Sequence, residues 1–245
     1  MLEGVHIGFL ILLPIVAFLY SSVGHGGASG YLALMVLFAF ETTFMKQTAL
    51  TLNLFVAGIA FVHYFKAGHF NWRLFLWFAL GSVPAAYIGG TINLDPVLYK
   101  RILGVLLLVS MVRMLTSLKT AETPPATVRI VPAIGLGLAI GLFSGLIGIG
   151  GGIILTPVLI LLHWARMKEA AAVSALFIWV NSAAGLTGQW YTGAQFDPNS
   201  WIYVALAVIG GFAGGYVGSQ RWSNRLLTYF LVGVLGIAAV KLFLI

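Results

Sequence analysis

The sequence predicts an all-α polytopic membrane protein, and three observations indicate this fold class. Hydrophobic residues make up 60% of the 245 residues and charged residues only 8%, against roughly 25% charged in an ordinary soluble domain. Apolar runs of about 20 residues, the length that crosses a hydrocarbon core, recur along the whole chain. A polar stretch divides the chain near its middle, and similar motifs follow one another on both sides of it. We expect two inverted repeats of about five helical segments each, including a short or broken helix after a glycine-rich turn.

The polar stretch, residues 118–129, contains two prolines and is the predicted linker. It separates an N-terminal repeat, residues 1–117, from a C-terminal repeat, residues 130–245, within one transmembrane domain. Four motifs match in the same order across the linker. The matched pairs are Ser21–Gly27 with Ser144–Gly151, Lys46-Gln47 with Lys168-Glu169, Gly81–Gly89 with Gly210–Gly218, and Gly104 with Gly233.

The apolar runs divide each repeat into five predicted helical segments. In the first repeat they are His6–Ser22, Gly27–Phe40, Gln47–Phe65, Trp72–Ile92 and Val97–Leu115. In the second they are Ile130–Leu146, Gly151–Leu162, Glu169–Gln189, Trp201–Ser219 and Leu226–Phe243. The second run of each repeat has 14 and 12 residues, about 21 and 18 Å as helix, which is short for a membrane span. These two segments either cross fully or re-enter.

An odd number of segments places the second repeat upside down relative to the first, as in many secondary transporters. Basic residues then fall nine on one side and four on the other, which favours the first side as cytoplasmic. We therefore expect a multi-pass protein of the cytoplasmic membrane with both termini outside. The four residues of the minor side are Lys46, Lys100, Arg101 and Lys241.

The two glycine-rich breaks are the candidate site of function. Small residues at this spacing also let helices pack closely, so packing is the alternative explanation. Unwound backbone at membrane depth, however, is tolerated only where it is buried in protein or lines a wet cavity. Each break also precedes a short segment, and the N–H groups at a helix start favour an anion. Two such breaks in inverted repeats are expected to meet at one anion site.

At these breaks the chain resembles a known family. The run from Gly141 to Pro157 (GLFSGLIGIGGGIILTP) is similar to the signature of the sulfite exporter TauE/SafE family, and Ser21–Gly30 (SSVGHGGASG) resembles its N-terminal copy. The resemblance covers essentially the whole chain. It implies a transporter of small sulfur-containing anions such as sulfite, organosulfonates or related sulfur carboxylates. The first copy departs from the pattern with His25 among its glycines and with Ala33 where the second has Pro157.

Polar groups in and near the breaks are the predicted substrate contacts, because they are the few that lie well inside apolar runs. His25 either pairs with the anion and carries a proton or forms a structural hydrogen bond. For the amides and hydroxyls the alternative is hydrogen bonding between or along helices. The candidates are Ser21, Ser22, Gly24, His25, Gly26, Gly27, Asn53, Ser144, Gly148, Gly150, Gly151, Thr156 and Asn181.

Enzymatic chemistry is not expected. There are no cysteines, and no acidic residue lies in the middle of an apolar run, so paired carboxylates and thiol or cysteine–metal chemistry are excluded. No nucleotide-binding Lys-Ser/Thr pair follows the glycines. We expect no cofactor, no metal and no nucleic-acid partner; the lipid bilayer and a small anion are the expected partners, with a homodimer as a working assumption. The rival functions are a passive anion channel and a non-transporting membrane assembly protein.

Overall fold

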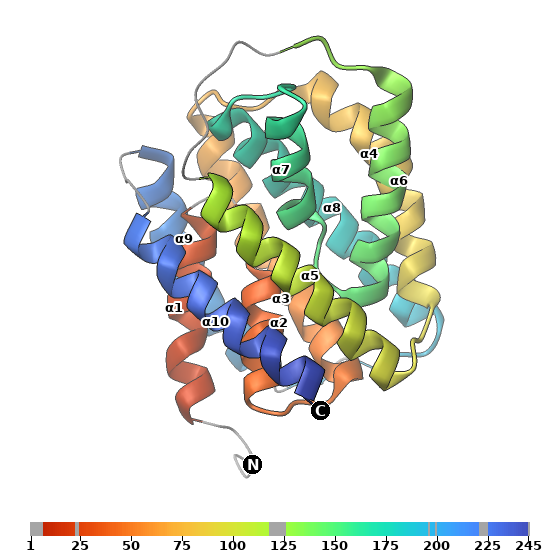
Figure 1. The fold of residues 1–245 in the computed structure, drawn as a ribbon, viewed down its shortest axis with the longest axis vertical. Helices are drawn as coiled ribbons and strands as arrows, with labels where there is room; N and C mark the ends of the chain where they lie inside the picture. Colours follow the sequence, from red (N-terminus) through yellow and green to blue (C-terminus); the bar gives the residue numbers. More distant parts are fainter. Residues whose placement is uncertain are drawn as a thin grey trace.

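The computed structural model describes residues 7–22, 25–117, 126–195, 197–198, 200–220 and 225–244. The described residues form ten α-helices and no strand (Figure 1). The helices are α1 (Ile7–Ser21), α2 (Ala28–Leu37), α3 (Thr42–Lys66), α4 (Trp72–Thr91), α5 (Pro96–Ser117), α6 (Ile130–Ile147), α7 (Gly152–Leu161), α8 (Met167–Tyr191), α9 (Ser200–Gln220) and α10 (Arg225–Leu244).

The predicted all-helical fold is confirmed, and each predicted segment corresponds to one helix. Among the described residues, five helices are long and apolar enough to cross a membrane, namely α3, α4, α6, α8 and α9. The clearest difference is at the start of α3, which begins at Thr42 rather than at Gln47. The sequence placed this polar turn outside the helix, but the structure buries Lys46 within it.

Short connections place the helix ends at two opposite ends of the bundle. Leu37 at the end of α2 accepts a hydrogen bond from Lys241 of α10, 2.9 Å, near the start of α3. At the opposite end, Asn71 before α4 donates a 2.7 Å hydrogen bond to Glu169 in the first turn of α8. We call these the lower and the upper end, as they lie in Figure 1.

The first two helices of each half form hairpins that open toward opposite ends. α1 rises from the lower end and α2 returns to it, whereas α6 descends from the upper end and α7 returns there (Figure 1). The backbone N–H of Ala126, before α6, donates to the carbonyl of His163, after α7, which places both at the upper end. α2 and α7 each have 10 residues, about 15 Å of helix, so each covers only half of a 30 Å hydrocarbon core.

Glycines fasten the first helix of each half to a partner helix in the other half. A Cβ at any of these glycines would collide with a backbone carbonyl of the facing helix, so the helix backbones lie in direct contact. α1 packs along α9 and α6 packs along α4. The contacts are Gly210, Gly214 and Gly218 on the carbonyls of Pro14, Phe18 and Ser22, and Gly137, Gly141 and Gly145 on those of Phe78, Ser82 and Ala86.

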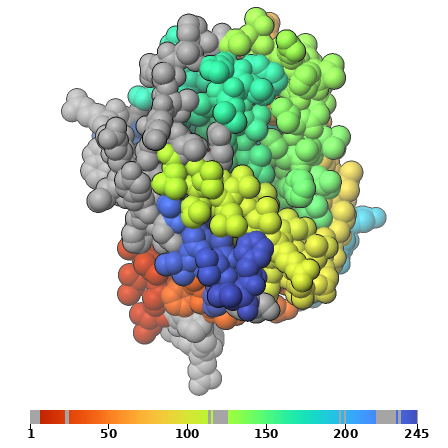
Figure 2. Space-filling view, in the orientation of Figure 1, coloured from red at the N-terminus to blue at the C-terminus, as the bar shows by residue number. Residues whose placement is uncertain are grey.

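The two long helices α3 and α8 pack on each other and form the centre of the bundle. Each has 25 residues, and buried residues occupy 56% and 72% of their most apolar windows, so they are largely shielded by other helices. α5 and α10 lie side by side across one face of the molecule, outside this centre (Figure 2). The turns of the two hairpins reach this centre at α3 and α8.

Candidate substrate-binding site

The first break lies between α1 and α2, and the structure describes it from His25 onward. The backbone N–H of His25 donates to the carbonyl of Tyr20, 2.9 Å. Gly27 is the N-cap of α2 with φ +98°, a left-handed conformation that suits glycine. Tyr31, one turn into α2, lies with its ring against Gly27 and fills the space that a Cβ there would occupy.

The second break lies between α6 and α7 and contains three left-handed glycines. Gly148 ends α6 with φ +85°, and Gly150 and Gly151 follow with φ +75° and +80°. The N–H of Gly148 still bonds to the carbonyl of Ser144, 2.9 Å, and Gly151 then caps the start of α7. Glycine is required here because three such φ values in four residues strain any other side chain.

Both breaks meet the same two residues of the central helices. A Cβ at Gly26 would lie 2.5 Å from Oδ1 of Asn53 and 2.8 Å from Cγ2 of Ile178. A Cβ at Gly150 would collide with Nδ2 of Asn53 and lie 2.9 Å from the same Cγ2 of Ile178. The two breaks therefore converge on one point, between Asn53 of α3 and Ile178 of α8.

Backbone N–H groups are available at this point. Within the described part of the chain, those of Gly26, Gly27, Gly150 and Gly151 form no backbone hydrogen bond. Such groups, next to the N-termini of α2 and α7, are the donors that bind anions at helix starts. The arrangement can thus bind a small anion through the main chain, without a basic side chain.

The side chain of Asn53 is fully buried at the meeting point. Its Nδ2 donates a hydrogen bond to Oγ of Ser182 on α8, 3.3 Å, and its Oδ1 has no partner among the described residues. An amide can turn over, because its oxygen and nitrogen are nearly equal in shape. In the turned amide, Ser182 donates to Oδ1 of Asn53, and Nδ2 faces Gly26 without a partner. Nδ2 can then donate a hydrogen bond to an anion.

Three of the hydroxyls predicted to contact the substrate donate their hydrogen bonds to acceptors within the protein. Ser21 donates to the carbonyl of Gly211 on α9, 2.7 Å. Ser22 donates to the carbonyl of Leu19 in its own helix, 2.7 Å. Thr156 of α7 donates to Oγ of Ser174 on α8, 2.8 Å. These geometries match the helix hydrogen bonding that was the alternative explanation for the hydroxyls.

The remaining predicted residues lie around the breaks with differing environments. Ser144 of α6 is buried, and its Oγ has no partner within the described ranges. Asn181 of α8 donates to the carbonyl of Phe177, 2.7 Å, while its Oδ1 is likewise unpaired there. His25 is half-buried at the first break. Gly24 lies outside the described residues.

Tyr31 and Ile178 lie at the two breaks, although the sequence did not predict them as site residues. Tyr31 is fully buried, and its hydroxyl has no partner among the residues the structure describes. A tyrosine hydroxyl that is buried normally finds a partner, so this unpaired group beside Gly27 is a further candidate donor. The available signal was its position one turn after the first glycine cluster.

Lys46, which the sequence placed in the connection before the third segment, lies inside the protein. It is the fifth residue of α3 and is buried, whereas its matched Lys168 is the second residue of α8 and is exposed. Its Nζ donates to the carbonyls of Gly89, Gly90 and Ile92 at 3.5, 3.3 and 3.1 Å, at the C-terminus of α4. The two matched lysines therefore lie in different environments, and Lys46 caps the C-terminus of α4 inside the protein.

Comparisons with known proteins agree with a membrane transporter. The family model of the sulfite exporter TauE/SafE matches residues 9–242. The chain is 36% identical to probable membrane transporter protein y4hK of Sinorhizobium fredii over 243 residues, 96% of this chain and 97% of that protein. It is 26% identical to probable membrane transporter protein MJ0441 of Methanocaldococcus jannaschii, over 96% of this chain and 97% of that protein. No solved structure matches it.

Proposed function

Because the chain belongs to the sulfite exporter TauE/SafE family and is a multi-pass membrane transporter rather than an enzyme, we propose that it is a secondary transporter of small sulfur-containing anions. The proposed substrates are sulfite, organosulfonates or related sulfur carboxylates, moved across the cytoplasmic membrane by alternating access. The observation behind this proposal is the convergence of Gly26 and Gly150 on Asn53 and Ile178.

The chemistry of the meeting point suits a small oxyanion. Main-chain N–H groups at two helix starts supply donors and a positive potential. Asn53, with its amide turned so that Ser182 donates to it, adds a neutral donor that does not hold the anion permanently. Neutral donors favour release as well as binding, because no buried cation is left uncompensated when the anion departs.

The two hairpins support an alternating-access mechanism. The hairpin of α1 and α2 opens toward the lower end, and that of α6 and α7 opens toward the upper end. We interpret this arrangement as an inverted repeat, in which each break is the inner end of a path to one face. The excess of basic residues makes the upper end, with Lys66, Arg73 and Arg129, the proposed cytoplasmic face and leaves both termini outside.

A counterflow assay tests the proposal. Purified protein is reconstituted into proteoliposomes that are loaded with unlabelled sulfite or methanesulfonate, and uptake of the labelled anion from outside is followed. We expect accumulation that depends on the internal anion. Rapid equilibration without counterflow would show a passive anion channel, and absence of any flux in oriented, folded protein would favour an assembly protein.

His25 is the proposed proton-coupling group at the first break. An imidazole gains or loses a proton near neutral pH, so it can couple movement of the anion to movement of a proton. Replacing His25→Ala is expected to abolish uptake or to remove its dependence on pH, with the protein still folded. Transport that keeps its rate and its pH dependence in the variant would remove His25 from the mechanism.

A further inference from the structure

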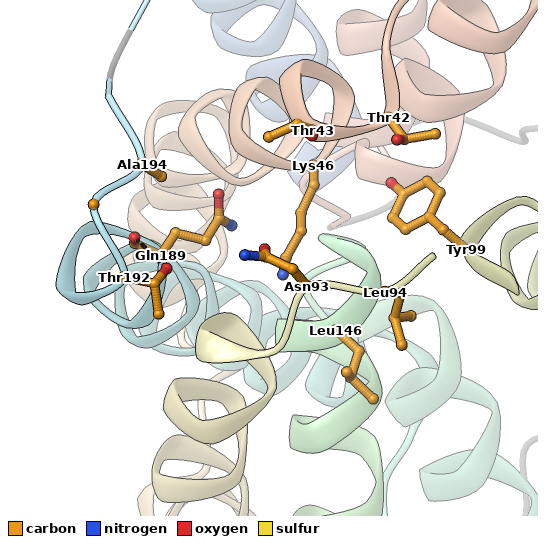
Figure 3. Close-up of a pocket in the computed structure, with 11 residues that line it drawn as sticks. Thr42, Thr43, Lys46, Asn93, Leu94, Tyr99, Leu146, Gln189, Thr192 and Ala194 are labelled. Carbon is orange, nitrogen blue, oxygen red and sulfur yellow. Dashed lines mark hydrogen bonds between the residues drawn. The ribbon is translucent and has the colours of Figure 1, made fainter. Parts of the chain in front are cut away.

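A second polar site lies beside the glycine breaks, at the lower end of the bundle. It is a cavity of about 380 Å³, which we call the Lys46 pocket (Figure 3). A volume of this size holds roughly a dozen waters, which is enough room for a hydrated oxyanion or a small organic sulfonate. The lining residues are Thr42, Thr43, Lys46, Asn93, Leu94, Tyr99, Leu146, Gln189, Thr192, Gly193 and Ala194.

The charge of this pocket is positive. Lys46 is the charged residue of its lining, and no acidic side chain lines it within the described part of the chain. The ammonium of Lys46 already donates to three carbonyls at the end of α4. It therefore contributes its charge to the pocket, while hydrogen bonds to a bound anion have to come from other groups.

Gln189 and the first turn of α3 offer hydrogen-bond donors to an anion. Gln189 of α8 is only 4% exposed, and its Nε2 has no partner among the described residues. Figure 3 shows its carboxamide extended toward the space beside Lys46. Thr42 and Thr43 begin α3, whose N-cap makes no side-chain hydrogen bond, so N–H groups of this first turn are also available.

The inner wall of the pocket is the end of α6, which leads directly into the second break. Leu146 lines the pocket, and the hydroxyl of Tyr99, another lining residue, donates to the carbonyl of Ile147, 2.8 Å. Gly148 lies against Lys46: a Cβ there would be 2.8 Å from the carbonyl oxygen of Lys46. Only the C-terminal end of α6 therefore separates an anion in the pocket from the second glycine break.

We propose that the Lys46 pocket is a separate access site, which binds a small sulfonate-like oxyanion from the face at the lower end before it reaches the breaks. The donors are Gln189 and the first turn of α3, and Lys46 supplies the attracting charge. Its place on a transport path rests on the proposed function, whereas anion binding in the pocket does not.

The test uses the full chain in proteoliposomes and exploits the absence of native cysteines. Thr192→Cys places a thiol in the pocket, and Thr127→Cys places one at the exposed upper end as the control. Alkylation rates with anionic iodoacetate and neutral iodoacetamide are compared. Adding Lys46→Met is expected to lower the iodoacetate-to-iodoacetamide ratio about threefold or more at position 192, because one nearby charge is lost, and to leave the ratio at position 127 unchanged.

Methanesulfonate is the probe for binding. Bound methanesulfonate is expected to protect the thiol of Thr192→Cys, which means that it lowers the rate of alkylation by iodoacetate. Gln189→Leu is expected to remove this protection. Gln47→Leu is the matched control, since Gln47 is also buried with an unpaired Nε2 among the described residues but does not line the pocket. Should Lys46→Met fail to fold, Gln189→Glu replaces it and is expected to lower the same ratio by adding a negative charge.

An unchanged ratio in a folded charge variant, or no protection by methanesulfonate in the Thr192→Cys background, would overturn the access site. Protection that Gln47→Leu also removes would overturn the role of Gln189. Failure of the transport proposal has a different signature, namely no counterflow while methanesulfonate still protects the thiol.

Discussion

Asn53 and Ser182 join the two halves of the chain by a 3.3 Å hydrogen bond between α3 and α8, at the point that both glycine breaks touch. Each residue lies in the middle of a 25-residue helix and is fully buried. The neutral pair therefore occupies the centre of the bundle, where a charged pair would lose its hydration.

Gly26 is predicted to be required for steric reasons rather than for backbone conformation. Its backbone is outside the left-handed region, but a Cβ would meet Asn53 and Cγ2 of Ile178. Gly26→Ala should reduce counterflow at least tenfold. Ile178→Leu removes the Cγ2 methyl and should restore part of the flux, because it relieves one of the two clashes. If the double variant is as impaired as Gly26→Ala, the convergence on Ile178 is not functional.

Asn53 is predicted to contribute a hydrogen-bond donor to the anion. Asn53→Asp keeps the shape but introduces a carboxylate that repels an anion, so counterflow should be lost. Asn53→Ser replaces the amide with a hydroxyl, which can still donate a hydrogen bond, and should keep a measurable fraction of the flux, with a raised KM. The KM and maximal rate of labelled sulfite uptake measure both effects. Equal activity of Asn53→Asp and the unmodified chain would exclude contact with the anion.

Two buried tyrosines should respond in opposite ways to removal of the hydroxyl. Tyr99→Phe breaks the hydrogen bond to the carbonyl of Ile147 and should lower the free energy of unfolding by about 1 kcal/mol. Tyr31→Phe removes a hydroxyl with no described partner, so it should leave stability unchanged or raised while lowering transport. Thermal unfolding in detergent and counterflow report the two quantities. Full transport by a stable Tyr31→Phe variant would make the hydroxyl irrelevant to the substrate.

Replacing a glycine of α6 with alanine should destabilise the protein at one position and be tolerated at another. A Cβ at Gly141 would collide with backbone atoms of Ser82, so Gly141→Ala should destabilise the protein by about 1–3 kcal/mol. Gly135→Ala, in the same helix, meets nothing within 4 Å and should be neutral or stabilising by about 0.5–1 kcal/mol. Similar unfolding temperatures for the two variants would contradict the close α4–α6 contact.

The helices were predictable because lipid-spanning segments need long apolar runs, and the runs were visible in the sequence. The breaks were predictable for a related reason: glycines clustered next to short segments mark unwound backbone. Asn53 was identified because few amides occur inside apolar runs. These inferences depend on local composition, which the sequence contains.

Residues whose importance depends on which helix faces which were not predictable. Ile178 is an ordinary apolar residue in the sequence, and only the packing of α8 brings its methyl group between the two breaks. The sequence placed Lys46 in the connection before the third segment, because its partners are main-chain carbonyls of α4 that no side-chain pattern reveals. For Ser21 and Ser22 the sequence left two explanations open, and their bonds to carbonyls of α9 and α1 match helix hydrogen bonding.

The meeting of the N-termini of α2 and α7 has an electrostatic consequence. Each helix start is equivalent to roughly half an elementary charge, so two of them facing one point amount to about one full positive charge. Unlike an imidazole or an amine, this charge comes from fixed peptide dipoles and has no proton to lose. The attraction for an anion at the breaks should therefore persist at every pH at which the protein is folded, and any pH dependence of transport must come from side chains.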